Sequence, residues 1–304
     1  MAKLVGLAAL IIPLTTGCSV EDVIRFGWPS GVTPQAEAMR NLWTWSAIAA
    51  LVVGAITWGA MFWAVAFHRR KKTDDATEVP RQTQYNLPVE IVFTVIPTII
   101  VAVLFGFTVN VQNFVDKDEP AQMHVDVTAF QWNWRFDYPD NKAADGKPVS
   151  TLGTTETIPL LVLPTGRSIE FTQHSNDVIH SFFVPEFLFK RDVFPMPEKN
   201  DQDFRWQIDS IDREGAFVGR CAELCGSYHS QMNFEVRALA PALYDQWVAL
   251  RTQTNPATGA AYTAGEALAK LGCGQLCTPT AYTTYPFTTD RTQRSASLPP
   301  STGS

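Results

Sequence analysis

Two long stretches without a charged residue restrict this chain to a membrane-anchored architecture. Leu42–Phe67 is 26 residues long and Ile91–Val109 is 19 residues long. About 20 mostly apolar residues suffice for a helix to cross the hydrocarbon core. The basic cluster His68–Lys72 follows the first stretch, and such clusters stay on the cytoplasmic side. We therefore predict a transmembrane helix hairpin at residues 41–111, with both ends of the chain outside the cytoplasm.

The first residues have the pattern of an export signal. Lys3 precedes an apolar run, Leu4–Leu14, and small residues then lead to Cys18. This order indicates a lipoprotein-like leader at residues 1–18, in which Cys18 would carry a lipid anchor. In the alternative, Cys18 is an ordinary thiol in a cleaved or retained leader. Both interpretations place residues 19–40 in an extracytoplasmic N-terminal segment.

Residues 112–254 show the pattern of a small all-β domain. Short runs that favour strands are separated by turn-forming residues such as Pro164 and Gly166. The runs are Met123–Thr128, Ser168–Thr172, Val178–Val184, Phe204–Ile208 and Asn233–Arg237. Because no long helical pattern separates them, they predict a β-sandwich or barrel outside the membrane.

The end of the chain has a different composition. Ala240–Arg251 favours a short helix, and residues 255–304 form a C-terminal extension rich in Thr, Ala, Ser and Pro. We expect this extension to be mostly extended, with one helix at Gly265–Leu271. Cys273 and Cys277 are predicted to form a disulfide, since the compartment is oxidising. The segments 141–157 and 190–203 are expected to be long loops that contact a partner.

The segment Cys221–Met232 carries the chemistry. It places two thiols, Cys221 and Cys225, together with His229 and Met232 within twelve residues. Thiolate, imidazole and thioether are soft or borderline ligands that suit copper better than magnesium or calcium. A second imidazole has to come from elsewhere, and His180 in a strand-like run is the best candidate.

Each part of this pattern has an ordinary explanation when it is taken alone. A C-x3-C pair in an exported protein is most often a disulfide, and a lone Met fills cores. Structural zinc would leave the Met unused. A covalent c-type haem is excluded because no C-x2-C-H occurs, and a net charge of −6 argues against nucleic acid. The clustering in one loop favours copper over these alternatives.

The motif C-x-E-x-C-G-x-x-H-x-x-M, preceded by D-V-I-H-S, resembles the dinuclear copper centre (CuA) of bacterial cytochrome c oxidase subunit II. The aromatic segment Gln131–Tyr138 and the pairs Val89-Glu90 and Ile96-Pro97 extend this resemblance over roughly residues 35–250. It implies a transmembrane hairpin followed by an all-β, cupredoxin-like Greek-key domain outside the membrane.

The resemblance also implies roles for individual residues. Two cysteines would bridge the coppers, each histidine would bind one, the methionine would be a weak ligand, and Glu223 would contribute its carbonyl. The side chain of Glu223 would reach a magnesium ion shared with subunit I. The implied copper ligands are His180, Cys221, Glu223, Cys225, His229 and Met232.

Three further residues have implied roles outside the metal. Trp132 would be the point at which electrons enter from the docked cytochrome, and Glu90 would lie at the mouth of a proton pathway into subunit I. Glu90 also has an ordinary interpretation, as a carboxylate that reaches the membrane surface. Asp177 is a lesser candidate for the docking surface.

The implied function is that of a respiratory oxidase subunit in the bacterial plasma membrane. It would accept electrons from cytochrome c and pass them to haem in subunit I, where oxygen reduction is coupled to proton pumping. Its partners would be subunits I and III, lipid, and a soluble or membrane-bound cytochrome c, including one in a supercomplex with a cytochrome bc complex. Residues 116–254 have a net charge of −8, which reflects either solubility or steering of a basic partner.

Three other classes deserve comparison. Quinol-oxidising relatives share the architecture but lack the copper ligands. This sequence has a suitable residue at every one of the six ligand positions, which argues against that class. Copper-delivery proteins use C-x3-C with a distant His on a thioredoxin-like fold. A structural lipoprotein would contain two disulfides and no metal.

Overall fold

A computed structural model describes residues 25–69, 77, 79 and 82–284 of the chain. The described residues divide into two compact units. One contains most of the two long helices, with Ala38–Phe114 as its main part, and the other contains Pro29–Glu37 and the residues from Val115 onward. The leader, including Cys18, and the end of the C-terminal extension lie outside the described residues.

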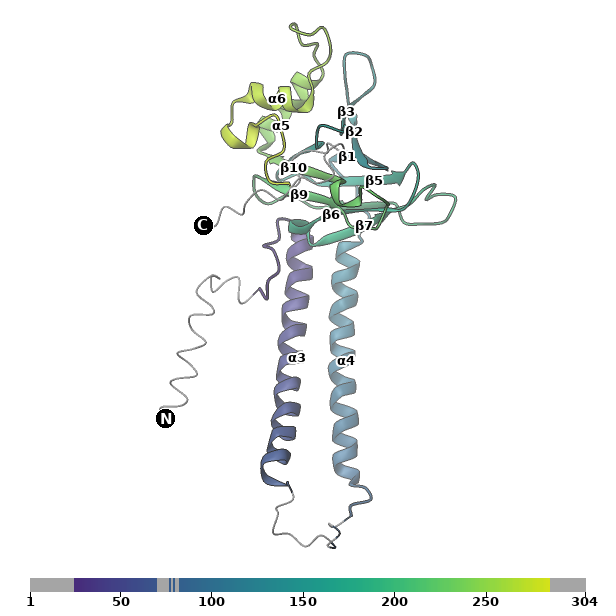
Figure 1. The fold of residues 1–304 in the computed structure, drawn as a ribbon, viewed down its shortest axis with the longest axis vertical. Helices are drawn as coiled ribbons and strands as arrows, with labels where there is room; N and C mark the ends of the chain where they lie inside the picture. The colour runs from purple at the N-terminus through teal and green to yellow at the C-terminus, as the bar shows by residue number, and fades with distance from the viewer. Residues whose placement is uncertain (1–24, 70–76, 78, 80–81, 285–304) are drawn as a thin grey trace. The chain divides into compact units, whose positions relative to one another are not determined.

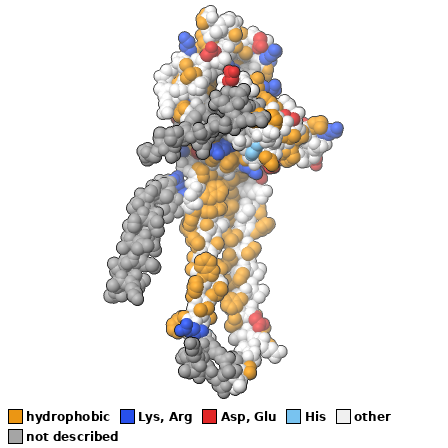
Figure 2. Space-filling model, in the orientation of Figure 1, with side chains coloured by type: hydrophobic (Ala, Val, Ile, Leu, Met, Phe, Trp, Pro, Cys, Tyr) orange, Lys and Arg blue, Asp and Glu red, His pale blue; other side chains and the backbone are white. Residues whose placement is uncertain are grey.

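The two predicted apolar helices are present. Helix α3 spans Pro34–Phe67 and helix α4 spans Leu87–Val115, with Pro97 inside it (Figure 1). Both are long and apolar enough to cross a membrane, and no residue of either apolar window is buried within the described chain. Hydrophobic side chains cover much of their visible surface (Figure 2). Such surfaces require lipid or other apolar partners, because large exposed apolar patches are unfavourable in water.

The second unit is built from two five-stranded sheets. The first has the order β3-β2-β1-β5-β8 and the second β4-β10-β9-β6-β7. The first sheet consists of β1 (Met123–Phe130), β2 (Asn133–Lys142), β3 (Pro148–Leu152), β5 (Ile169–Ser175) and β8 (Arg205–Ile208). The second consists of β4 (Leu160–Pro164), β6 (His180–Val184), β7 (Phe189–Val193), β9 (Gly215–Cys221) and β10 (Asn233–Leu239).

The pairing pattern gives a mixed sandwich of the cupredoxin-like type. Strand β1 pairs in parallel with β5, and β4 pairs in parallel with β10, whereas the other neighbouring pairs are antiparallel. Parallel neighbours require a crossover connection, so the chain passes between the two sheets. All five predicted strand runs are confirmed, and the predicted β-sandwich is confirmed with them.

Aromatic side chains from both sheets fill the space between them. Trp134 on β2 lies with its ring centroid 5.3 Å from that of Phe234 on β10 and 6.1 Å from that of Phe182 on β6. All three side chains are fully buried. Burying a large apolar side chain stabilises a fold by roughly 1.5–3 kcal/mol, so this cluster is a main source of sheet-to-sheet cohesion.

Gly219 on β9 leaves the space that Phe234 occupies. A Cβ atom at this position would lie 2.2 Å from two ring carbons of Phe234. We predict that Gly219→Ala lowers the free energy of unfolding by about 1–3 kcal/mol, the usual effect of overpacking a core. Urea unfolding of the full-length chain in detergent, followed by Trp fluorescence, measures this loss. Gly54→Ala, where an added Cβ has no neighbour within 4 Å, is the control, and equal midpoints for the two variants would refute the prediction.

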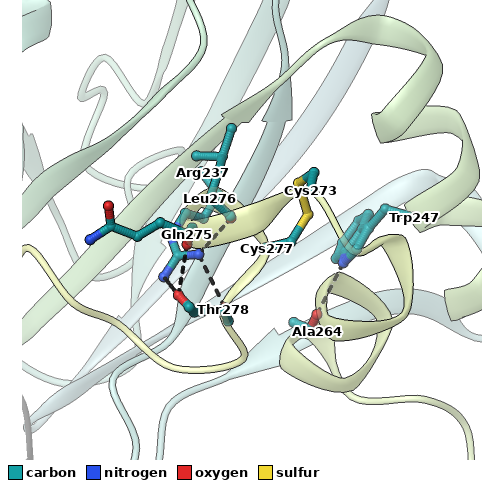
Figure 3. Close-up of a disulfide and its surroundings, with 8 residues drawn as sticks. All are labelled: Arg237, Trp247, Ala264, Cys273, Gln275, Leu276, Cys277 and Thr278. Atoms are coloured by element: carbon teal, nitrogen blue, oxygen red, sulfur yellow. Dashed lines mark hydrogen bonds between the residues drawn. A yellow bond between two sulfur atoms is a disulfide. The ribbon is translucent and has the colours of Figure 1, made fainter.

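Both helices that were predicted after the sheets are present. Helix α5 spans Pro241–Arg251, as expected, and α6 spans Ala264–Leu271, followed by the 3-10 turn η4 at Gly274–Cys277. A capping box between Thr263 and Glu266 begins α6, and Trp247 of α5 donates its indole N–H to the Ala264 carbonyl at 3.1 Å (Figure 3). The helix predicted at Gly265–Leu271 is therefore confirmed, and apart from η4 the rest of residues 255–284 forms turns and irregular backbone.

The predicted disulfide between Cys273 and Cys277 is confirmed, with 5.2 Å between the Cα atoms (Figure 3). Two expected loops are shorter than predicted. Strand β3 occupies part of 141–157, and β7 occupies the start of 190–203, because β2 and β6 each supply an antiparallel partner.

A buried ion pair attaches the end of the described chain to β10. The Arg237 guanidinium lies 2.6 Å from a Glu235 carboxylate oxygen, and both side chains are fully buried. Arg237 also donates to the Leu276 and Thr280 carbonyls, both at 2.7 Å. The other Glu235 oxygen accepts a hydrogen bond from the Thr283 N–H at 2.7 Å. The C-terminal segment thereby covers the outer side of β10, whose residues are all buried.

Candidate metal centre

The sequence-predicted ligands come from the ends of three neighbouring strands. His180 is the first residue of β6, and Cys221 is the last residue of β9. These strands pair antiparallel, with Phe182 opposite Cys221. The loop after β9 carries Cys225 and returns at Met232, whose carbonyl accepts the Cys221 N–H at 3.0 Å. Strand pairing thus brings together residues that lie more than forty positions apart.

The two cysteines of this loop are free thiols. Their Sγ atoms lie 3.7 Å apart, which is too far for a disulfide bond. The other C-x3-C pair, Cys273 and Cys277, is disulfide-bonded. Identical spacing therefore gives two different arrangements in one chain, and only the pair in the candidate site remains available to a metal.

Each sulfur has an imidazole beside it. The Nδ1 of His180 lies 3.8 Å from Cys221 Sγ, and the Nδ1 of His229 lies 3.4 Å from Cys225 Sγ. The Sδ of Met232 lies 3.8 Å from Cys225 Sγ. His180, Cys221 and Cys225 form a buried group whose potential ligand atoms lie within 4.8 Å of one another.

The sixth predicted ligand also points at the cluster. The carbonyl oxygen of Glu223 lies 3.3 Å from Cys221 Sγ. Two thiols, two imidazoles, a thioether and a carbonyl are thereby gathered in one place. This donor set fits copper, because soft sulfur ligands and imidazoles are its preferred partners in proteins.

The electrostatics of the cluster favour a thiolate. The contact with Cys225 lowers the pKa of the Cys221 thiol, burial opposes that change, and the contact with His180 lowers the pKa further. The same sulfur contact raises the pKa of Cys225. Burial acts against a charged His180, but its contacts with Cys221 and Asp177 outweigh burial and raise its pKa. The first proton is therefore lost from Cys221, where a metal cation would bind.

Asp177 fixes the orientation of the His180 ring. One oxygen of its carboxylate lies 2.8 Å from His180 Nε2, and the other accepts the Gln131 N–H at 2.6 Å. Burial raises the pKa of Asp177, but these hydrogen bonds outweigh it and the pKa is lowered overall. A carboxylate at the far nitrogen leaves Nδ1 facing the sulfur and is a common support for metal-bound histidines.

Trp132 lies against the cluster through the main chain of Cys225. Its indole N–H donates to the Cys225 carbonyl at 3.0 Å, and the Gln131 side-chain amide donates to the same oxygen at 2.8 Å. Gln131 and Trp132 form the two-residue turn between β1 and β2. Gln131 and Trp132 are thereby in direct contact with Cys225, although they lie almost a hundred residues before it in the sequence.

Glu90 lies in the other unit, in the first turn of α4. One of its carboxylate oxygens accepts the Asn86 N–H at 2.9 Å. The residue thus helps to cap the start of the helix, and its expected role at a proton pathway stays a prediction.

Sequence reasoning missed several contacts around the cluster. Gln131 was noted only as part of an aromatic segment, and Tyr228 only as a residue of the metal loop. Trp134 donates its indole N–H to the Met232 carbonyl at 3.3 Å. Asp177, considered for a docking surface, is the partner of His180 and Gln131. Its place three residues before His180 was the only feature of the sequence that could have predicted this contact.

The sandwich, the buried thiol–imidazole cluster and the two long apolar helices define a membrane protein with a cupredoxin-like domain and a copper-compatible site. Residues 123–239 match the family described as cytochrome c oxidase subunit II, periplasmic domain. The probable cytochrome c oxidase subunit 2 of Nocardia farcinica is 46% identical, over 98% of this chain and 90% of that one. Cytochrome c oxidase subunit 2 of Mycobacterium tuberculosis is 41% identical, over 96% of this chain and 89% of that one.

A solved structure is similar to part of the chain. The periplasmic domain of subunit II of cytochrome oxidase from Bradyrhizobium japonicum is 25% identical, covering 43% of this chain and 94% of that one, with a TM-score of 0.35. Because these two relatives match over nearly their full length, the chain belongs to the cytochrome c oxidase subunit II family. It is a component of a haem–copper oxidase, an oxidoreductase, and its partners are other subunits of that complex.

Proposed function

We propose that this chain accepts electrons from a cytochrome c at Trp132 and delivers them to haem in subunit I, where oxygen is reduced. The observation that carries the proposal is the pair of unbonded sulfurs, 3.7 Å apart, each next to an imidazole nitrogen. A copper pair bound there would supply a one-electron relay. His180, Cys221, Glu223, Cys225, His229 and Met232 would hold it.

The protein around the cluster favours rapid electron transfer because its groups are held in place. Met232 and His180 are fully buried, and Cys221 and Cys225 are nearly so. Asp177 fixes one imidazole, and the Trp134 indole holds the Met232 carbonyl. Ligands that cannot rearrange limit the structural change that accompanies each electron. Trp132 then connects the protein surface to Cys225 by one hydrogen bond.

The remaining roles in the oxidase are part of the same proposal. The two apolar helices anchor the chain in the plasma membrane beside subunits I and III and lipid, with the β unit outside. The side chain of Glu223 would help to hold a magnesium ion shared with subunit I, and Glu90 would lie at a proton pathway used in pumping. The net charge of −8 over residues 116–254 favours a basic cytochrome, soluble or in a supercomplex with a cytochrome bc complex.

The copper-delivery alternative required a thioredoxin-like α/β fold. The described residues instead form a mixed β-sandwich with two long apolar helices. The alternative with two disulfides required Cys221 and Cys225 to be bonded, and they are free. Both findings favour the oxidase function.

Trp132→Ala in the assembled oxidase tests the proposed path. We expect unchanged copper content and a decrease of about 10- to 100-fold in cytochrome c oxidation, the range found when a group that supports a metal ligand is removed. A small neutral reductant, which bypasses the protein docking site, should support a normal rate. Unchanged cytochrome c oxidation would remove Trp132 from the path.

A further inference from the structure

Tyr228, a residue of the metal loop Cys221–Met232, packs against Trp132. The two ring centroids lie 5.0 Å apart, and the ring planes make an angle of 77°, an edge-to-face contact. Tyr228 directly precedes His229, and its carbonyl accepts the Gln231 N–H at 2.9 Å. The ring therefore extends from the short turn that carries a predicted copper ligand.

The Trp132 indole is held by three groups of the same loop. Its N–H donates to the Cys225 carbonyl at 3.0 Å. Gly226 lies so close that an added Cβ would be 3.2 Å from two indole atoms, and its φ of +117° favours glycine. The Tyr228 ring supplies the third contact. Of these three groups, only Tyr228 is a side chain that a substitution can shorten without altering the ligand backbone.

We propose that Tyr228 is a positioning residue for electron acceptance: its ring holds the Trp132 indole against the Cys225 carbonyl. This inference rests on the proposed role of Trp132. Tyr228 acts through Trp132, and its aromatic ring makes the edge-to-face contact. The residue therefore sets how well an incoming electron from a cytochrome-type donor is coupled to the metal loop.

The first test measures the position of Trp132 without any turnover. Hydroxyl-radical footprinting of the full assembled oxidase, read by mass spectrometry, reports how reactive the Trp132 side chain is. We expect Tyr228→Ala to raise this reactivity about two- to tenfold, the factor that corresponds to one aromatic pair. Tyr228→Phe keeps the ring and should match the parent protein. Equal reactivity in all three proteins would overturn the proposal.

The second test is a double-mutant cycle on the rate of electron transfer from cytochrome c. Copper content and the copper spectrum should be unchanged in every variant. Tyr228→Ala is expected to slow the transfer about two- to tenfold, with Tyr228→Phe close to the parent. In a Trp132→Ala background, Tyr228→Ala should cause no further loss, because its effect passes through the indole.

The outcomes separate this inference from the proposed function. If Trp132→Ala slows the reaction and Tyr228→Ala does not, the inference fails and the function stands. If the two losses are additive, Tyr228 acts independently of Trp132 and the inference also fails. If Trp132→Ala itself leaves the rate unchanged, the proposed electron path fails, and the role of Tyr228 fails with it.

Discussion

Replacing Cys225 with serine is expected to remove copper from this chain. Its sulfur contacts Cys221 Sγ at 3.7 Å, His229 Nδ1 at 3.4 Å and Met232 Sδ at 3.8 Å, so it touches three of the predicted ligands. A hydroxyl group is a much poorer ligand for copper than a thiolate. Copper affinity should fall by more than the roughly 10- to 100-fold that follows the loss of an outer partner of a metal ligand.

Metal analysis of the purified full-length chain gives the copper content directly. The matched control is the double variant Cys273→Ser and Cys277→Ser, which removes the other C-x3-C pair, bonded as a disulfide. That control should keep its copper. Retention of copper by Cys225→Ser, or loss of copper in the control, would contradict the assignment of the loop cysteines.

Breaking the buried ion pair on β10 is expected to be the most destabilising change away from the metal. Glu235→Gln leaves the Arg237 guanidinium buried without its carboxylate, which lies 2.6 Å away in the intact protein. Removal of one partner of a buried pair costs about 3–5 kcal/mol, because the other charge remains uncompensated. The variant also weakens the contacts of Glu235 with Thr283, so the C-terminal segment should loosen.

Urea unfolding of the full-length chain in detergent measures the loss of stability, and limited proteolysis reports release of residues 276–284. Asp245→Asn is the control, since the Arg167–Asp245 pair lies at the surface. An exposed pair contributes only about 0–1 kcal/mol. If Glu235→Gln were no more destabilising than Asp245→Asn, the C-terminal segment would not depend on the buried pair.

The membrane helices and many strands could be predicted because their signals are local. An uncharged apolar run identifies a membrane helix, yet it does not give the start of the helix. Helix α3 begins at Pro34, well before the apolar run, because Thr33 accepts the Ala36 N–H at 3.0 Å and Pro34 suits the first turn. Hydropathy alone does not detect such a polar first turn.

One strand that was not predicted, β4, lacks the alternation that identifies a half-buried strand. Every residue of β4, Leu160–Pro164, is buried, since one face packs on the core and the C-terminal part of the chain covers the other. Such a continuous apolar run cannot be assigned by periodicity alone. Strands β3 and β7 lie in segments that looked like loops, and pairing with β2 and β6 decides their structure.

The sequence predicts which residues are the ligands of the candidate site, but not how the surrounding residues are arranged around them. Cys221, Cys225, His229 and Met232 lie in one loop, so their clustering is visible in the sequence. His180 was chosen because it lies in a strand-like run, and the structure places it beside Cys221. The contacts of Gln131 and Trp132 with the metal loop arise from distant segments. No local pattern predicts such contacts.

The copper content and electron paramagnetic resonance spectrum of the full-length chain, loaded with copper, test the assignment of the metal ligands. We predict two copper ions per chain and a signal split by two equivalent copper nuclei, because the two sulfurs, 3.7 Å apart, would hold the coppers as one pair. A single bound copper with an ordinary one-nucleus pattern would rule out a copper pair at this site, as would a folded chain in which Cys221 and Cys225 are disulfide-bonded and no copper binds.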